Sequence, residues 1–108
     1  MKFMKDNKLK IGFIGCGNIA CFHADVLKYL GHDIVAASAL DLNSNNLKYF
    51  RKEYNVTSSY SSWSNMIENE KLDALWVTVN WDVIDKIFLD ILAYGIPTFF
   101  EKPIALNR

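Results

Sequence analysis

Three small residues follow a short apolar run near the start of the chain. Gly15, Gly17 and Ala20 stand at the spacing G-x-G-x-x-A within the stretch GCGNIA. Glycine at the first position permits a tight turn, glycine at the second lets a ligand approach the main chain, and a small third residue lets a helix lie against a strand. The free amides at the start of that helix, around Asn18 and Ile19, would then bind phosphate groups. The spacing predicts a cradle for the pyrophosphate of a dinucleotide.

An acidic side chain stands where such a cradle needs one. Asp41 ends a second apolar run and comes 21 positions after Ala20. At the end of the second strand of a dinucleotide-binding unit, a carboxylate accepts hydrogen bonds from the hydroxyls of the adenine-side ribose and repels a 2′-phosphate. Residues 42–46, LNSNN, contain neither arginine nor lysine, although Lys48 lies within reach of the same region. The pattern predicts NAD as the cofactor and makes NADP the weaker alternative.

Two other interpretations of these residues stay open from the pattern alone. A glycine-rich turn beside a surface aspartate would show the same residues without binding a ligand. A methyltransferase that binds S-adenosylmethionine also uses a glycine loop and an acid after its second strand. The dinucleotide interpretation is favoured because a strand precedes the glycines, a helix follows them and the acid comes at the required distance.

Apolar runs that suit strands alternate with stretches of helical periodicity along the whole chain. Strands are expected within residues 8–15, 32–41, 56–60, 72–79 and 96–103, and helices within residues 18–31, 44–55 and 81–95, with a short helix beginning near Ser61 or Ser62. Alternation with short connections implies right-handed βαβ units. The predicted fold class is α/β: a doubly wound parallel sheet of the Rossmann type, with helices on both faces, truncated after the fifth strand.

Apolar positions within the helices predict which sides they bury. The side chains that recur at helical spacing are, in the first helix, Ile19, Phe22, Val26, Leu27 and Leu30; in the second, Leu47, Phe50 and Tyr54; and in the last, Ile84, Ile87, Phe88, Ile91 and Leu92. The second helix is expected to be capped by Asn43 or Ser44.

The composition is that of an ordinary globular domain. Hydrophobic residues make up 51% and charged residues 22% of the 108 residues, and twelve basic residues balance twelve acidic ones. A chain with zero net charge has no broad positive potential to attract nucleic acid or an anionic membrane surface, so neither is expected as a partner. We expect no signal peptide or membrane span, and Cys16 and Cys21 lack metal-ligand spacing. These features predict a cytoplasmic protein with reduced thiols, no metal site, and one dinucleotide-binding domain over residues 1–108.

The end of the sequence, FFEKPIALNR, adds a second motif. Glu101-Lys102-Pro103 resembles the EKP motif of the Gfo/Idh/MocA oxidoreductases. The stretches IGFIGCGNIACFHADVL, ALDLN, KLDALWVTVN and AYGIPTFFEKPIA resemble successive segments of that family, so the resemblance covers essentially the whole chain. It implies that Lys102 lies beside the nicotinamide and positions or polarises the reacting hydroxyl. It also implies that Glu101 and Pro103 belong to the cofactor site, with Glu101 near the nicotinamide ribose and Pro103 often following a cis peptide bond.

The turn after the fourth expected strand departs from the family pattern. Thr78-Val79-Asn80 stands where many members carry a Thr-Pro-Asn-like turn. The resemblance implies that Thr78 and Asn80 keep polar groups beside the nicotinamide ribose, although the rigidity of the proline is lost. Trp81 and its neighbours replace a histidine that often follows this turn, so the surface facing the substrate is expected to be atypical.

The resemblance implies an NAD(P)-dependent oxidoreductase that transfers hydride between the nicotinamide and a hydroxyl of a small carbohydrate-like molecule: a sugar, a polyol or a nucleotide sugar. In that family a second, larger domain supplies most substrate contacts, and the present chain ends five residues after Pro103. We therefore expect a fragment that is inactive alone, from a parent that is a homo-oligomer. The alternative is a stand-alone NAD-binding sensor or partner module without catalysis.

Three further expectations concern residues beside these motifs. His23, eight positions after Gly15, is expected to be hydrogen-bonded within the packing of the first helix on the sheet. Cys16 is expected to fill space in the glycine loop, because no histidine or second cysteine is placed to activate it. Removal of a second domain is expected to expose apolar side chains on this one, with Trp81, Ile96 and Phe99 as the candidates.

Overall fold

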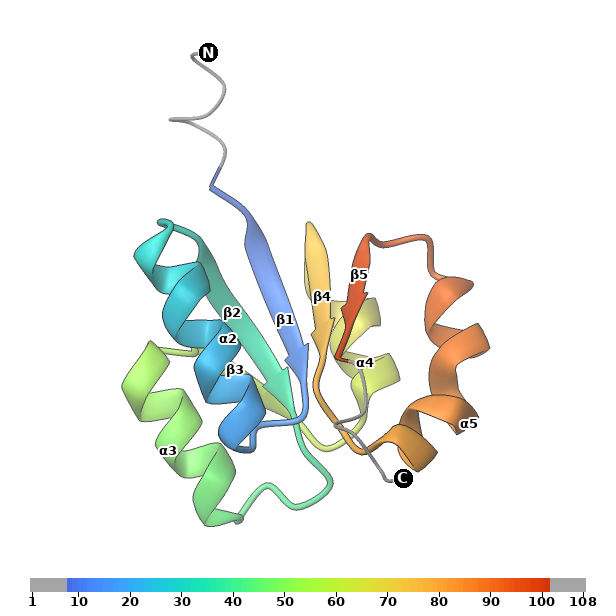
Figure 1. Ribbon diagram of the computed structural model, residues 1–108, viewed down its shortest axis with the longest axis horizontal. Helices are drawn as coiled ribbons and strands as arrows, with labels where there is room; N and C mark the ends of the chain where they lie inside the picture. Colours follow the sequence, from blue (N-terminus) through green and yellow to red (C-terminus); the bar gives the residue numbers. More distant parts are fainter. Residues whose placement is uncertain (1–7, 102–108) are drawn as a thin grey trace, which may run out of the picture.

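The computed structural model describes residues 8–101. Strands and helices alternate along these residues without exception, as the sequence predicts (Figure 1). Their order is β1 (Lys10–Ile14), α2 (Asn18–Tyr29), β2 (Asp33–Ser38), α3 (Asn45–Tyr54), β3 (Ser58–Tyr60), α4 (Trp63–Asn69), β4 (Ala74–Val77), α5 (Trp81–Leu92) and β5 (Thr98–Phe100).

The five strands form one parallel sheet in the order β3-β2-β1-β4-β5. The chain winds outward from β1 through β2 to β3, then crosses back to place β4 on the other side of β1. This reversal is the topological switch point of a doubly wound sheet, outside which ligands of such sheets bind. The predicted α/β class with helices on both faces is confirmed.

Each face of the sheet carries its own hydrophobic core. One core joins β1 and β2 to buried side chains of α2 and α3, among them Leu27 and Phe50. The other joins the central strands to α4 and α5 through Met66, Ile67, Ile84 and Ile91. Figure 1 shows α2 and α3 lying together over one side of the sheet, with α4 and α5 at the other.

The starts of α3 and α4 follow directly from the sequence. Ser44 accepts a hydrogen bond from the amide of Leu47 at 3.2 Å, and Ser62 accepts one from the amide of Asn65 at 3.3 Å. A serine in this position satisfies one of the amides that have no partner within the helix. Of the two predicted caps for α3, the structure therefore selects Ser44.

The predicted apolar face of α2 is wrong in most of its members. The residues that α2 buries are Ala20, Ala24 and Leu27, whereas Phe22 is 64% and Val26 47% exposed. The two alanines let the helix lie close to a sheet whose facing side already carries large rings, such as Phe13, and no further large side chain fits there. On α5 the predicted stripe is confirmed for Ile84 and Ile91, while Phe88 and Leu92 stay partly exposed because α5 covers the edge of the sheet.

Candidate dinucleotide site

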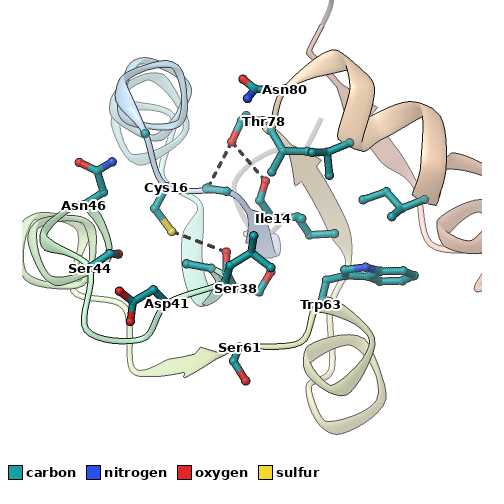
Figure 2. Close-up of a pocket in the computed structure, with 17 residues that line it drawn as sticks. Ile14, Cys16, Ser38, Asp41, Ser44, Asn46, Ser61, Trp63, Thr78 and Asn80 are labelled. Atoms are coloured by element: carbon teal, nitrogen blue, oxygen red, sulfur yellow. Dashed lines mark hydrogen bonds between the residues drawn. The ribbon is translucent and has the colours of Figure 1, made fainter.

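A cavity of about 490 Å³ lies at the switch point, above the carboxyl ends of β1, β2 and β4 (Figure 2). Its size is that of a small-molecule site. Its walls are contributed by the loops that follow four of the strands and by the starts of α3, α4 and α5. The lining residues are Ile14, Gly15, Cys16, Gly17, Ser38, Ala39, Leu40, Asp41, Ser44, Asn46, Ser61, Trp63, Thr78, Val79, Asn80, Val83 and Ile87.

The protein's own packing requires glycine at position 15. Its φ is +101°, a conformation that residues with a Cβ rarely adopt, and its amide donates to the carbonyl oxygen of Ser38 at 3.0 Å. A Cβ built on this backbone would lie 2.9 Å from Cγ1 of Val79 and 3.0 Å from the carbonyl oxygen of Thr78. Gly15 therefore lets the loop after β1 close against the loop after β4.

Thr78 joins these two loops from the other side. Its amide donates to the carbonyl oxygen of Ile14 at 2.9 Å. Its hydroxyl is within hydrogen-bond distance of the carbonyl oxygens of Ile14 and Gly15, at 3.3 Å and 3.2 Å, as Figure 2 shows. Asn80, at the start of α5, is exposed at the same end of the cavity. The hydroxyl thus organises the loop, and the Asn80 amide is available to a ligand.

Gly17 contrasts with Gly15. It is the residue before the first turn of α2, with an ordinary φ of −82°, and a Cβ there would meet no atom within 4 Å. Contacts within residues 8–101 therefore give no reason for glycine at this position. A ligand that approaches the main chain closely does give one.

The amides at the start of α2 lack the caps found on α3 and α4. No side chain accepts a hydrogen bond from the first turn, and the first intrahelical bond runs from the amide of Cys21 to the carbonyl oxygen of Gly17. The amides of Asn18 and Ile19, both on exposed residues, are therefore left for another acceptor. Because a helix N-terminus carries partial positive charge, that acceptor is best an anion such as a phosphate. Ala20 is fully buried and serves the packing of α2 instead.

Asp41 is held at the rim of the cavity by a local turn. Its Oδ1 accepts from the amide of Asn43 at 2.9 Å, and its carbonyl oxygen accepts from the amide of Ser44 at 3.1 Å. The turn leaves Oδ2 to accept from a ligand hydroxyl. Figure 2 shows the carboxylate beside the start of α3, with Ser44 and Asn46 as neighbours.

No lysine or arginine lines this cavity in the part of the chain that the structure describes, and Asp41 is its one charged lining residue. Lys48 is exposed on α3 outside the lining. Arg51 uses its guanidinium on the carbonyl oxygens of Val56 and Thr57 and on the hydroxyl of Ser59. The lining therefore offers a carboxylate for a ribose and no cation for a 2′-phosphate, while the exposed amides of Asn18 and Ile19, directly after the lining residue Gly17, are left for a pyrophosphate.

Comparison with known proteins identifies the group to which this arrangement belongs. The model of the Gfo/Idh/MocA oxidoreductase family, which has an NAD-binding Rossmann fold, matches residues 9–108. The chain belongs to this family. The matched part of this family is an NAD-binding Rossmann domain. This excludes the two other interpretations of the glycine loop, a turn without a ligand and a methyltransferase that binds S-adenosylmethionine.

Inositol dehydrogenases are among its relatives. Myo-inositol 2-dehydrogenase of Thermotoga maritima is 27% identical over 99 residues, which are 92% of this chain and 29% of that protein. The structure of myo-inositol 2-dehydrogenase from Lactobacillus plantarum superposes with a TM-score of 0.76 and 31% identity over 93% of this chain and 30% of that one. Scyllo-inositol dehydrogenase from Lactobacillus casei, with bound NAD(H) and scyllo-inositol, shares the fold with a TM-score of 0.77 and 24% identity over 93% of this chain and 29% of that one. The chain spans less than a third of each of these proteins.

Several residues that line the cavity were not predicted from the sequence. Ser61 comes from the short connection after β3, Trp63 is the first residue of α4, and Val83 and Ile87 come from the first two turns of α5. Figure 2 shows Trp63 across the cavity from Asp41. Only their position in the sequence could have indicated these residues, because residues directly after a parallel strand lie at the end of the sheet where ligands bind.

Cys16 lines the loop as a small buried side chain. Its thiol is 3.8 Å from the carbonyl oxygen of Ser38, to which it donates, and 6% of the residue is exposed. Burial raises the pKa of this thiol to about 12, so the neutral form dominates at physiological pH. The thiol therefore fills space in the loop and is not an activated nucleophile.

The side chains of His23 and Glu101 meet at the end of β5. The amide of Glu101 donates to the carbonyl oxygen of Val77 at 3.0 Å, and Oε1 of Glu101 is 2.6 Å from Nε2 of His23. His23 is therefore hydrogen-bonded in the packing of α2, as predicted. Glu101 is not among the residues that line the cavity, and its contact with the nicotinamide ribose stays a prediction. Lys102 and Pro103 lie outside the described residues.

Proposed function

We propose that this chain is the cofactor-binding part of an enzyme that transfers hydride between NAD and a hydroxyl group of a polyol, a sugar or a nucleotide sugar. The observation that carries the proposal is the cavity at the switch point. It has an open position at Gly17, which leads directly into the uncapped first turn of α2, and a single carboxylate at its rim. Relatives named for their action on inositol support a substrate with ring hydroxyls.

The described residues fit the two polar parts of the cofactor. The amides of Asn18 and Ile19 would hold the pyrophosphate, and Asp41 would accept hydrogen bonds from the adenine-side ribose. Because the dinucleotide extends across the switch point, its other half would lie over the ends of β4 and β5, near Asn80. NAD, when bound there, supplies the hydride acceptor.

Substrate chemistry is assigned to residues at and beyond the end of β5. Lys102, outside the described residues, is proposed as the cation that stabilises negative charge on the substrate oxygen as its proton departs. We assign the remaining substrate contacts to a second domain, since this chain spans less than a third of the inositol dehydrogenases it matches. On this proposal the chain alone binds NAD and does not turn over substrate.

Exposed aromatic side chains and free cysteines support the proposals about the second domain and the cellular compartment. Trp81 and Phe99 are 52% and 38% exposed and offer apolar surface to a second domain, whereas Ile96 is partly buried against the core. The parent is proposed to be a cytoplasmic homo-oligomer, and the two free thiols of Cys16 and Cys21 agree with a reducing compartment. Within the described residues, no helix is both long enough and apolar enough to cross a membrane.

Calorimetric titration of NAD and NADP into this chain tests the cofactor assignment. We expect saturable NAD binding, NADP binding at least about tenfold weaker, and an Asp41→Ala variant that loses about tenfold in NAD affinity, because a hydrogen bond to a charged group is removed. Asp90→Ala, an exposed acid on α5 outside the cavity lining, is the matched control and should bind NAD as the wild type does. Equal affinity of the Asp41→Ala variant and the wild type for NAD would remove Asp41 from the site.

A further inference from the structure

Two residues 78 positions apart in the sequence meet near the end of the sheet. Nε2 of His23, on α2, lies 2.6 Å from Oε1 of Glu101, just after β5. The side chains are only 20% and 26% exposed, so the bond is largely shielded from water. The imidazole also has two rings as neighbours: its centroid is 5.6 Å from that of Phe22 and 5.0 Å from that of Phe99. The histidine is therefore fixed in position as well as hydrogen-bonded.

The pair connects the two halves of the cofactor site. α2 carries the amides for the pyrophosphate at its first turn, and His23 stands in the second turn of the same helix. Glu101 follows β5, on the side of the switch point opposite to Asp41 and β2. Since the adenine-side ribose belongs to the β2 side, the nicotinamide half belongs to the β4 and β5 side. The bond thus ties the phosphate helix to the strand end that faces the nicotinamide half.

The carboxylate of Glu101 depends on this partner. Its backbone amide is fixed by the carbonyl oxygen of Val77, so the position of the residue is set by β4. The direction of its side chain is set by His23, which is its one hydrogen-bond partner within residues 8–101. Without the imidazole a partly buried carboxylate would be left unpaired, and it would turn away to reach water.

We propose that His23 is a positioning residue for the nicotinamide half of the site: its Nε2–H holds the Glu101 carboxylate against α2 and so fixes the carboxyl end of β5. This inference rests on the proposed function. His23 does not touch the cofactor on this account, and acts through Glu101. The adenine half of the site, built from Gly17 and Asp41, does not depend on the pair.

Titration with two ligands tests the proposal. NADH occupies both halves of the site, whereas ADP has the adenosine and the two phosphates and lacks the nicotinamide riboside. We expect His23→Ala to weaken NADH binding about five- to tenfold, since the Glu101 carboxylate loses the partner that directs it, and to change ADP binding less than about twofold. His23→Gln should restore most of the NADH affinity, because its side-chain amide can donate to Glu101.

Glu101→Ala provides a second variant at the outer end of the sheet, for use should His23→Ala not fold. On our account it loses at least as much NADH affinity as His23→Ala, because it removes the carboxylate that His23 directs, and the double variant loses no more than Glu101→Ala alone. NADH affinity equal to that of the wild type in Glu101→Ala would overturn the positioning role, because His23 would then have no carboxylate through which to act.

His32→Ala is the matched control. Nδ1 of His32 accepts a hydrogen bond from the amide of Leu9 at 3.1 Å, at the end of the sheet where the strands begin and opposite to the cavity. Its removal should leave the ratio of NADH to ADP affinity unchanged. Equal loss of both ligands in His23→Ala, or no loss of NADH affinity, overturns the inference. A wild-type chain that binds neither ligand contradicts the proposed function itself, and the inference with it.

Discussion

The backbone of Gly15 and that of Thr78 touch at the switch point of the sheet. The hydroxyl of Thr78 lies 3.2 Å from the carbonyl oxygen of Gly15, and a Cβ on Gly15 would come within 3.0 Å of the carbonyl oxygen of Thr78. The contact draws together the loops that follow β1 and β4; these strands are neighbours in the sheet, and the two contacting residues are 63 positions apart in the chain. The floor of the cofactor cavity is therefore built by a close approach of backbone to backbone.

Gly15→Ala is expected to destabilise the fold. The new methyl group would meet backbone atoms of Thr78, which cannot move as a flexible side chain would, and the φ of +101° would be strained. We expect a loss of about 2–4 kcal/mol in the free energy of unfolding, measured by urea denaturation. Wild-type stability in this variant would show that the two loops are not in contact in solution.

The Gly17→Ala variant is expected to lose NAD affinity while it keeps most of its stability. The backbone of Gly17 suits any residue and the methyl group would meet open space, so the free energy of unfolding should fall by no more than about 1 kcal/mol, the cost of a poorer helix cap. NAD affinity should fall by about tenfold or more, because the methyl group would occupy the path of the pyrophosphate. Calorimetry and urea denaturation on the same sample measure both quantities. NAD affinity equal to that of the wild type would move the pyrophosphate away from this loop.

Ala24→Leu is expected to push α2 away from the sheet. Ala24 is fully buried beneath the helix, and a leucine there has no space to occupy. We expect a loss of about 1–3 kcal/mol in the free energy of unfolding. Val26→Ala, two residues along on the exposed side of the same helix, should change it by less than about 0.5 kcal/mol. The reverse order of the two effects would mean that α2 turns its larger residues to the sheet.

Cys16 is expected to resist alkylation. Burial raises its pKa to about 12, so the reactive thiolate is scarce at pH 8, and the sulfur atom is also shielded from the reagent. Iodoacetamide at pH 8, followed by mass spectrometry, should modify Cys16 far more slowly in the native chain than in urea, and more slowly than the half-buried Cys21. Native Cys16 reacting as fast as the thiol of the unfolded chain would contradict its burial.

The same pKa gives stability a definite dependence on pH. An unfolded thiol has a pKa near 8.5, and the folded value is higher, so folding favours the protonated form of Cys16. Its contribution is complete below about pH 8.5 and is lost as the pH rises toward 12. Cys16→Ala should therefore show a smaller fall in stability between pH 8 and pH 10 than the wild type.

Local patterns in the sequence were sufficient for the order of the strands and helices and for the place of the glycine loop. The glycine spacing, the acid after the second strand and the serine caps are each set by neighbouring residues, and the structure places them where the pattern predicts. The side of α2 that packs on the sheet was not predictable in this way. Alanine carries little hydrophobic signal, and the space above β1 that selects Ala20 and Ala24 is limited by the rings of Phe13 on β1 and Phe50 on α3.

Contacts across the sheet were the other part that local patterns could not supply. The bond between His23 and Glu101 joins residues 78 positions apart, and Trp63 reaches the cavity from the start of α4, where no motif marks it. Both depend on the crossing of the chain from β3 back to β4, which brings the two halves of the fold together. Strand order must therefore be known before such residues can be assigned to a site.

The most direct test of the account is a titration of the isotopically labelled chain with NAD, followed by amide NMR spectra. The central claim is that NAD lies across the switch point, with its pyrophosphate on the first turn of α2. We predict that the largest shifts fall on the amides of Gly17, Asn18 and Ile19, with further shifts around Asp41 and Asn80, and that the amino ends of the strands do not respond. Saturable shifts confined to other surfaces, or no shifts from a folded sample, would contradict the claim.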